Sequence, residues 1–92
     1  MKIGHVDLGE TPLLLAPMED VTDVSFRYIC KKFGADMMFT EFISSDGLIR
    51  DVPGSVYKLT IYDYERPIGM QVYGHIPEAI VESARRIEAA NP

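Results

Sequence analysis

The chain has 92 residues, which is enough for one small domain and no more. Apolar residues make up 47% of it and charged residues 25%, the proportions of a globular protein rather than of a disordered segment. The formal net charge of −5 argues against nucleic-acid binding by these residues alone, because phosphate neutralisation needs clustered lysine and arginine. No apolar run approaches the roughly 18 residues of a membrane helix, and residues 1–5 lack the pattern of a signal peptide. We therefore expect a cytoplasmic protein without a membrane segment.

The first predicted elements lie in residues 1–17. Residues 3–8 alternate between apolar and polar and then meet a turn at residues 9–12. Residues 13–17 form a short, continuous apolar run, which is typical of a strand buried on both faces in a parallel sheet. We predict a hairpin-like N-terminal strand that leads into a first buried strand.

A helix is predicted between residues 22 and 34. Thr22 or Asp23 suits its N-cap, and Gly34 is a natural residue to end it. Its apolar side chains recur at i, i+3, i+4 and i+7, namely Phe26, Ile29, Cys30 and Phe33. This spacing predicts one inner face, on which Cys30 is a small core residue rather than a nucleophile. Residues 37–42 are a second buried strand, and the order strand, helix, strand predicts parallel pairing.

Residues 43–66 carry a weaker pattern. The serines at 44–45 suit the N-cap of a short helix over residues 46–51, and Pro53 with its following glycine predicts a break. Residues 55–59 fit a second helical turn, although their alternation also fits a strand. We expect a helix here, because parallel strands need a crossover connection that is usually helical.

The last part of the chain predicts a strand and a helix. Residues 68–72 are the third strand, and Pro77 suits the first turn of the helix that follows. The predicted inner stripe of that helix is Ile80, Ala84 and Ile87. Glu82 and Arg86 form an i,i+4 pair on its outer side, and His75 is expected to be a solvated residue near the helix start. The whole chain therefore predicts an α/β fold with three parallel strands.

The end of the first strand carries the most specific motif. Residues 15–19 are Leu-Ala-Pro-Met-Glu, and residues 20–27 continue through Val-Thr-Asp to Phe-Arg. This arrangement resembles the opening motif of the tRNA-dihydrouridine synthase family. Pro17 ends the strand ladder and has no N–H, and the resemblance implies that Pro17, Met18 and Glu19 present free backbone groups to a flavin ring. The family usually has a small residue in place of Glu19, and Ala-Pro-Met alone would indicate only a strand-to-loop corner.

Two more segments resemble the same family, each at the end of a predicted strand. Thr40-Glu41-Phe42 places a glutamate where the family's glutamate faces the active-site mouth, so Glu41 is a candidate substrate-binding residue. An equal alternative is a carboxylate turned to solvent or bound to neighbouring backbone or lysine. Residues 66–74 resemble the family's third strand, in which a glutamine contacts the flavin, so Gln71 is a candidate cofactor-binding residue. The alternative for Gln71 is a core-facing amide satisfied by backbone.

The resemblance implies a particular α/β architecture, a partial TIM (β/α)8 barrel. It would consist of the first three β/α units with the N-terminal hairpin-like strand. A complete barrel needs about 250 residues, so residues 1–92 would be the N-terminal part of a flavin-binding TIM barrel and an incomplete domain. The open sheet edges of such a fragment predict self-association.

The implied activity is the reduction of uridine to dihydrouridine in tRNA, with FMN as cofactor and NADPH as electron source. The family's catalytic cysteine lies in an Asn-x-Gly-Cys-Pro stretch after the fourth strand, which we expect downstream of Pro92. No catalytic residue is therefore expected in this fragment, which would itself be inactive. The single cysteine and the two histidines have no metal-ligand spacing, so no metal site is predicted.

Two alternatives to this function stay open at the level of sequence. One is another FMN-dependent barrel of the dihydroorotate-dehydrogenase or old-yellow-enzyme type, since these share the Ala-Pro-Met opening. The Val-Thr-Asp and Phe-Arg continuation, together with Thr-Glu after the second strand, favours the tRNA enzyme. The other alternative is an α/β binding or structural module without catalysis.

Overall fold

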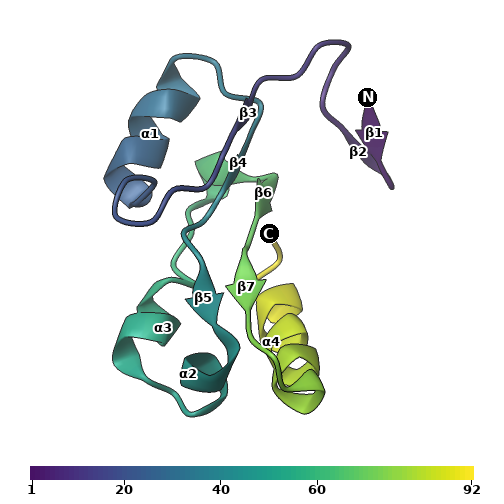
Figure 1. The fold of residues 1–92 in the computed structure, drawn as a ribbon. Coiled ribbons are helices and arrows are strands. Elements are labelled where there is room, and N and C mark those ends of the chain that lie inside the picture. The colour runs from purple at the N-terminus through teal and green to yellow at the C-terminus, as the bar shows by residue number, and fades with distance from the viewer.

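Three parallel strands form the central sheet of the computed structural model, which describes residues 1–92. The strands are β3 (Leu14–Leu15), β4 (Met37–Phe39) and β6 (Ile68–Gly69), and they lie in the order β3-β4-β6 (Figure 1). Leu14 pairs with Met37, and Met38 pairs with Ile68, both in parallel register. The predicted α/β arrangement of three parallel strands is confirmed.

The helices occupy the crossovers between these strands and the end of the chain. They are α1 (Val24–Lys32), α2 (Ser45–Ile49), α3 (Pro53–Tyr57), the 3-10 turn η1 (Asp63–Glu65) and α4 (Pro77–Ala89). Figure 1 places α1 beside β3 and β4, and it places α2, α3 and α4 together around a second, smaller pair of strands. No helix is both long and apolar enough to cross a membrane.

The second and third strands are each interrupted, where the sequence predicts continuous strands over 37–42 and 68–72. After a break they resume as β5 (Ile43–Ser44) and β7 (Val72–Tyr73), which pair in parallel. The segment that joins β4 to β5 is one residue longer than the segment that joins β6 to β7. The extra residue makes a bulge, which a period-2 pattern does not reveal.

Thr40 holds the two halves of this interrupted pair together. Its backbone N–H donates to the carbonyl of Gly69 at 2.9 Å, and its hydroxyl accepts from the N–H of Gln71 at 3.2 Å. The carbonyl of Gln71 in turn accepts from Ile43 at 2.8 Å. A side-chain oxygen thus replaces a backbone partner at the bulge, and Thr40 is buried for that reason.

The N-terminal hairpin differs from the expectation in its turn. β1 (Lys2–Ile3) and β2 (Val6–Asp7) pair antiparallel around Gly4 and His5, so the hairpin turn lies within the predicted strand of residues 3–8. The chain also bends at residues 10–11 as predicted, but this bend does not join paired strands. Gly4 has φ 59°, which glycine adopts at little cost. The hairpin stands apart from the three-stranded sheet (Figure 1) and does not pair with β3.

Helix α1 begins and ends as its sequence predicts. The side chain of Asp23 accepts from the N–H of Phe26 at 2.9 Å, so Asp23 rather than Thr22 is the N-cap. Gly34 has φ 106° and donates to the carbonyl of Lys31, while Ala35 donates to that of Cys30. These two bonds make the Schellman motif that ends a helix at glycine.

The apolar face of α1 is not buried, which corrects the predicted inner face. Phe33 is 86% exposed and Ile29 is 54% exposed, whereas the buried residue of the helix is Arg27. Cys30 is half-buried in an apolar hollow with Phe33 and residues 13–15. Arg27 is buried because it pairs with Glu65 of η1, and the elements of residues 1–92 leave Ile29 and Phe33 uncovered.

Helices α2 and α3 follow the prediction closely, with one error. Ser44 caps α2, since its hydroxyl accepts from the N–H of Gly47 at 3.2 Å. The expected break between the two helices occurs at residues 50–52 rather than at Pro53, because Pro53 is the first residue of α3. Proline suits this position, where its missing N–H would have no helical partner.

Helix α4 starts at Pro77 as predicted but buries a different stripe. Its buried residues are Ala79 and Ser83, while Ala84 is exposed. The predicted pair forms, with Arg86 Nε 3.4 Å from a carboxylate oxygen of Glu82. Arg86 does not lie on the outer side, because it donates to the Leu48 carbonyl of α2 at 2.6 Å. His75 is exposed and makes no capping bond, since the N-cap of α4 is Ile76.

The apolar core is thin and lies between the strands and the pair α2 and α4. Its buried members are Leu8, Met38, Ile43, Leu48, Ile68 and Ala79. Only 12 of the 92 residues are buried, and half of these are polar or charged. Such a small core leaves a large share of the apolar side chains at the surface.

Candidate cofactor and substrate site

The carboxyl ends of the parallel strands bring two of the predicted site residues together. Pro17 follows β3, and Gln71 lies between β6 and β7. Both line one open hollow with Phe39, Gly69, Met70 and Val72. The hollow has a volume of about 480 Å³, within the roughly 300–1,000 Å³ of small-molecule sites. Parallel strands end at one edge of a sheet, and this is where ligands bind in α/β folds.

Gln71 has a fixed backbone and a free side chain. Its N–H is bound by Thr40 and its carbonyl by Ile43. The residue is exposed, and its carboxamide makes no hydrogen bond, so the alternative of a core-facing glutamine is wrong. A free carboxamide offers both donors and an acceptor to a ligand.

Gly69 is a close-contact position in the same hollow. A β-carbon at Gly69 would overlap the ring of Phe39. The absence of a side chain at Gly69 therefore lets the Phe39 ring lie flat against the strand. This keeps the floor of the hollow open beside Gln71.

Met18 and Glu19 differ in what their backbone groups can do. The N–H of Met18 donates to the Thr22 hydroxyl at 2.9 Å, and its carbonyl accepts from Thr22 and Val21. The backbone of Met18 is therefore already bound within the loop, contrary to the expectation that it is free. Glu19 has no such backbone bonds, so of the two residues it keeps backbone groups available to a ligand.

The side chains of Glu19 and Glu41 tie the loop between β3 and α1 to neighbouring residues. Lys58 Nζ lies 2.7 Å from Glu19 Oε1. Glu41 Oε2 accepts a hydrogen bond from the backbone N–H of Asp20 at 2.7 Å. Asp20 has a left-handed backbone conformation, with φ 63°. Of the alternatives for Glu41, the structure shows the contact with neighbouring backbone, and this contact stabilises a left-handed residue of the loop.

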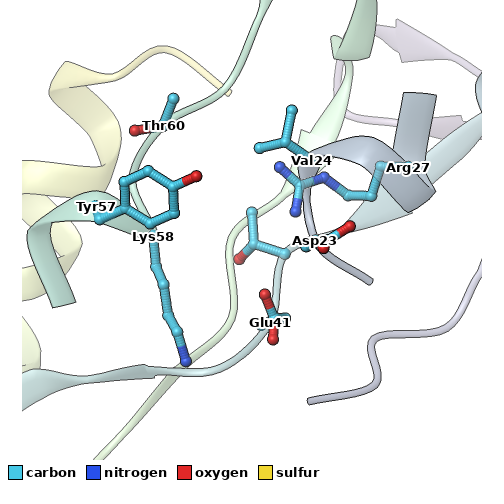
Figure 2. A pocket seen from close by; sticks show the side chains of 8 residues that line it. Asp23, Val24, Arg27, Glu41, Tyr57, Lys58 and Thr60 are labelled. Atoms are coloured by element: carbon cyan, nitrogen blue, oxygen red, sulfur yellow. The ribbon is translucent and has the colours of Figure 1, made fainter. Parts of the chain in front are cut away.

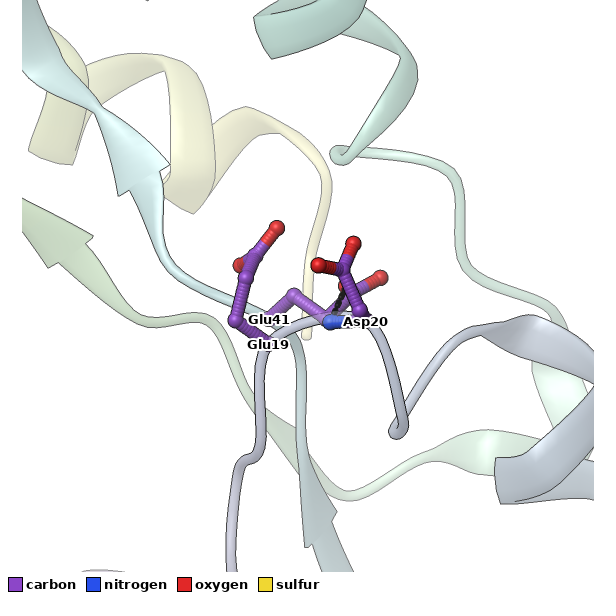
Figure 3. Close-up of side chains that lie close together, drawn as sticks. All are labelled: Glu19, Asp20 and Glu41. Carbon is purple, nitrogen blue, oxygen red and sulfur yellow. Dashed lines mark hydrogen bonds between the residues drawn. The ribbon is translucent and has the colours of Figure 1, made fainter.

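The carboxylates of Glu19, Asp20 and Glu41 gather at this point (Figure 3), within 4.8 Å of one another. Oxygen ligands at such spacing are the kind that hard cations take. Lys58 and the Asp20 amide already balance part of this charge. Acidic groups with such partners do not by themselves make a metal site.

Behind the loop lies a small pocket that the sequence does not predict. Figure 2 shows Asp23, Arg27, Glu41 and Lys58 around it, from α1, the end of β4 and the segment after α3. The cavity measures about 20 Å³, which holds roughly one water molecule. It is therefore too small for a cofactor or a nucleotide, and the open hollow beside Gln71 is the candidate ligand site.

The comparisons with known proteins bear on this site. The sequence model of the dihydrouridine synthase (Dus) family matches residues 14–91. A probable tRNA-dihydrouridine synthase of Aquifex aeolicus is 41% identical over 73 residues, which is 78% of this chain and 22% of that protein. A probable tRNA-dihydrouridine synthase of Rickettsia prowazekii is 37% identical over 89 residues, 96% of this chain and 27% of that protein.

More distant curated relatives agree with these matches. The tRNA-dihydrouridine synthase B of Xanthomonas axonopodis is 33% identical over 85 residues, 92% of this chain and 25% of that protein. No solved structure matches the chain. The chain spans about a quarter of the length of the curated relatives that it matches.

Proposed function

Because the chain belongs to the dihydrouridine synthase family, we propose that it forms the first three β/α units of the TIM barrel of an FMN-dependent tRNA-dihydrouridine synthase. The observation that carries the proposal is the convergence of Pro17 and Gln71 on one hollow at the carboxyl ends of the strands. Barrel enzymes hold their ligands at this end. A dihydroorotate-dehydrogenase-like activity or a module without catalysis finds no comparable support among the relatives.

The residues of the hollow fit a flavin ring. Gln71 offers a free carboxamide to the N–H and carbonyl groups of the ring edge, and Gly69 keeps the floor of the hollow open. Pro17 bounds the hollow at the end of β3. Met18 and Glu19 follow in the loop outside its lining, and Glu19 keeps free backbone groups there. Bound FMN would supply the redox chemistry, a hydride transfer to the uracil double bond with electrons from NADPH.

Glu41 and Lys58 are assigned to the substrate side of this site. Glu41 uses one carboxylate oxygen to hold the loop of residues 18–22, and its other oxygen is left for a substrate group. Lys58 neutralises Glu19 beside the loop. A tRNA substrate would approach the site from the side of Glu41 and Lys58. An enzyme that acts on tRNA is expected in the cytoplasm.

The proton that the uracil ring needs does not come from Cys30. That cysteine lies on α1 in an apolar hollow with Phe33, away from Gln71. We assign the general acid to the family's cysteine after the fourth strand, downstream of Pro92. The 92 residues would then form part of the cofactor-binding site and would be inactive on their own.

Flavin titration tests the proposal directly. FMN fluorescence should be quenched on addition of the chain, and Gln71→Ala should weaken binding by about tenfold, because about 1–1.5 kcal/mol of hydrogen bonding is lost. His75→Ala is the matched control, since His75 is exposed and lies outside the hollow. Equal affinities for the two variants would refute the assignment of Gln71.

A further inference from the structure

Two exposed aromatic rings lie beside the proposed flavin hollow. Phe42 is 38% exposed and Tyr73 is 51% exposed, and their ring centroids are 5.1 Å apart at an interplanar angle of 86°. Phe42 comes just before β5, and Tyr73 is in β7, opposite Ser44. Neither ring serves the core of the chain, so their pairing at the surface needs another reason.

A continuous path connects these rings to the flavin hollow. A second hollow is lined by Phe42, Gln71 and Tyr73 and shares Gln71 with the first one. A third shares Phe42 and Tyr73 and extends to Ser44, Ser55 and Lys58. The path thus runs from the proposed flavin, across two aromatic rings, to hydroxyl groups and a lysine.

Lys58 lies at the end of this path, where its ammonium group is paired with Glu19. Its Nζ lies 5.1 Å from the centroid of the Phe42 ring, donates to the Phe42 carbonyl at 3.3 Å and pairs with Glu19. An ammonium group has three N–H donors, and two of them are used by these partners. The third is left for an acceptor on a ligand above the rings.

We propose that Phe42, Tyr73 and Lys58 form a stacking platform for a nucleobase of single-stranded RNA next to the reduced uridine. This inference rests on the proposed function, which brings tRNA to this end of the barrel. Aromatic faces bind unpaired bases of any sequence, and a neighbouring cation binds the phosphate. Both side chains are exposed, and Lys58 Nζ lies 5.1 Å from the centroid of the Phe42 ring, so a base stacked on these rings would have an ammonium group beside it.

Anisotropy of a labelled single-stranded hexauridylate, titrated with the chain, tests the platform. Phe42→Ala and Tyr73→Ala should each weaken binding by about tenfold, the size expected for the loss of one base–aromatic stack. Tyr73→Phe keeps the ring and should bind like the parent chain. Phe33→Ala, which removes an 86% exposed ring on α1, is the control and should also leave binding unchanged.

The outcomes separate this inference from the proposed function. The platform is refuted if hexauridylate does not bind the chain, or if it binds Tyr73→Ala and Phe33→Ala equally. This holds whatever the result of the FMN titration. Weaker RNA binding by Tyr73→Ala with normal FMN binding supports the platform. Ring-dependent RNA binding without any FMN binding supports the platform while the flavin assignment fails. Circular dichroism of each variant excludes misfolding, and Tyr73→Phe reports on the ring alone.

Discussion

The ion pair between Arg27 and Glu65 is the most buried ion pair of the chain. Arg27 Nε lies 2.6 Å from Glu65 Oε2, and the two side chains are 4% and 0% exposed. Arg27 also donates to the Thr22 carbonyl at 2.8 Å, and Glu65 accepts from the N–H of Tyr62 at 3.1 Å. The pair therefore joins α1, the loop before it and η1, with most polar atoms satisfied.

Removal of one partner should be costly. Arg27→Met leaves the Glu65 carboxylate buried without its counter-charge, and we expect a loss of about 3–5 kcal/mol in the free energy of unfolding. The double variant Arg27→Met with Glu65→Leu removes both charges and should recover much of that loss. Urea denaturation of the single and double variants measures both values. A single variant as stable as the parent would contradict the buried pair.

Tyr64 should titrate above the ordinary tyrosine range. Partial burial raises the pKa of its phenol above 10.0, and the negative charge of Glu65 raises it further. The folded chain then holds this proton more tightly than the unfolded chain. Its stabilising contribution is complete below about pH 10 and is lost as the pH rises through the folded pKa. Absorbance at 295 nm should show that Tyr64→Phe lacks the most alkaline part of the tyrosinate titration, while Tyr57→Phe keeps it.

Sequence reasoning at the scale of residues succeeded where the contact is local. Asp23 and Phe26 are three positions apart, so the N-cap was readable from the residue types. Arg27 and Glu65 are 38 positions apart, and no spacing rule connects them. The contact of Glu41 with the Asp20 amide was only one of several open alternatives, because a carboxylate at a strand end has many possible partners.

At the scale of elements, the bulge after β4 decides the shape of the candidate site. The interruption separates β4 from β5 and turns Gln71 outward while its backbone stays bound to Thr40. The ends of α1 were predicted well, because the Asp23 cap and Gly34 are local features, whereas α2 and α3 each end two residues before their predicted ends. The strand breaks were not, because a bulge depends on the partner strand and on the Thr40 hydroxyl.

Gly69→Ala should disturb the flavin hollow. The new β-carbon would displace the Phe39 ring, and the ring would move into the space beside Gln71. We expect FMN affinity to fall at least tenfold, with a stability loss of about 1–3 kcal/mol from overpacking. Gly54→Ala is the control, because nothing lies within 4 Å of a β-carbon there and alanine favours helix α3. If the two variants bind FMN equally, the close contact at Gly69 has no role in the site.

At the scale of the whole molecule, the chain exposes more apolar surface than a self-sufficient domain would. β3 is an edge strand of the sheet order β3-β4-β6, and Leu14 on it and Leu13 just before it are exposed. The adjoining face of α1 adds Ile29 and Phe33. The sequence identifies this face of α1 as apolar, but the expectation that it packs inward is not met within residues 1–92.

This surface should drive self-association of the isolated chain. An unpaired edge strand with an apolar face beside it favours contact with a second copy. Light scattering across a concentration series should show dimers or larger species for the parent chain. Ile29→Lys together with Phe33→Lys should shift the chain toward monomer, because association would bury two unpaired charges. Val81→Lys on α4, at a similarly exposed apolar position, should associate like the parent. A parent chain that stays monomeric at high concentration would show that the edge of β3 and the face of α1 do not recruit another copy.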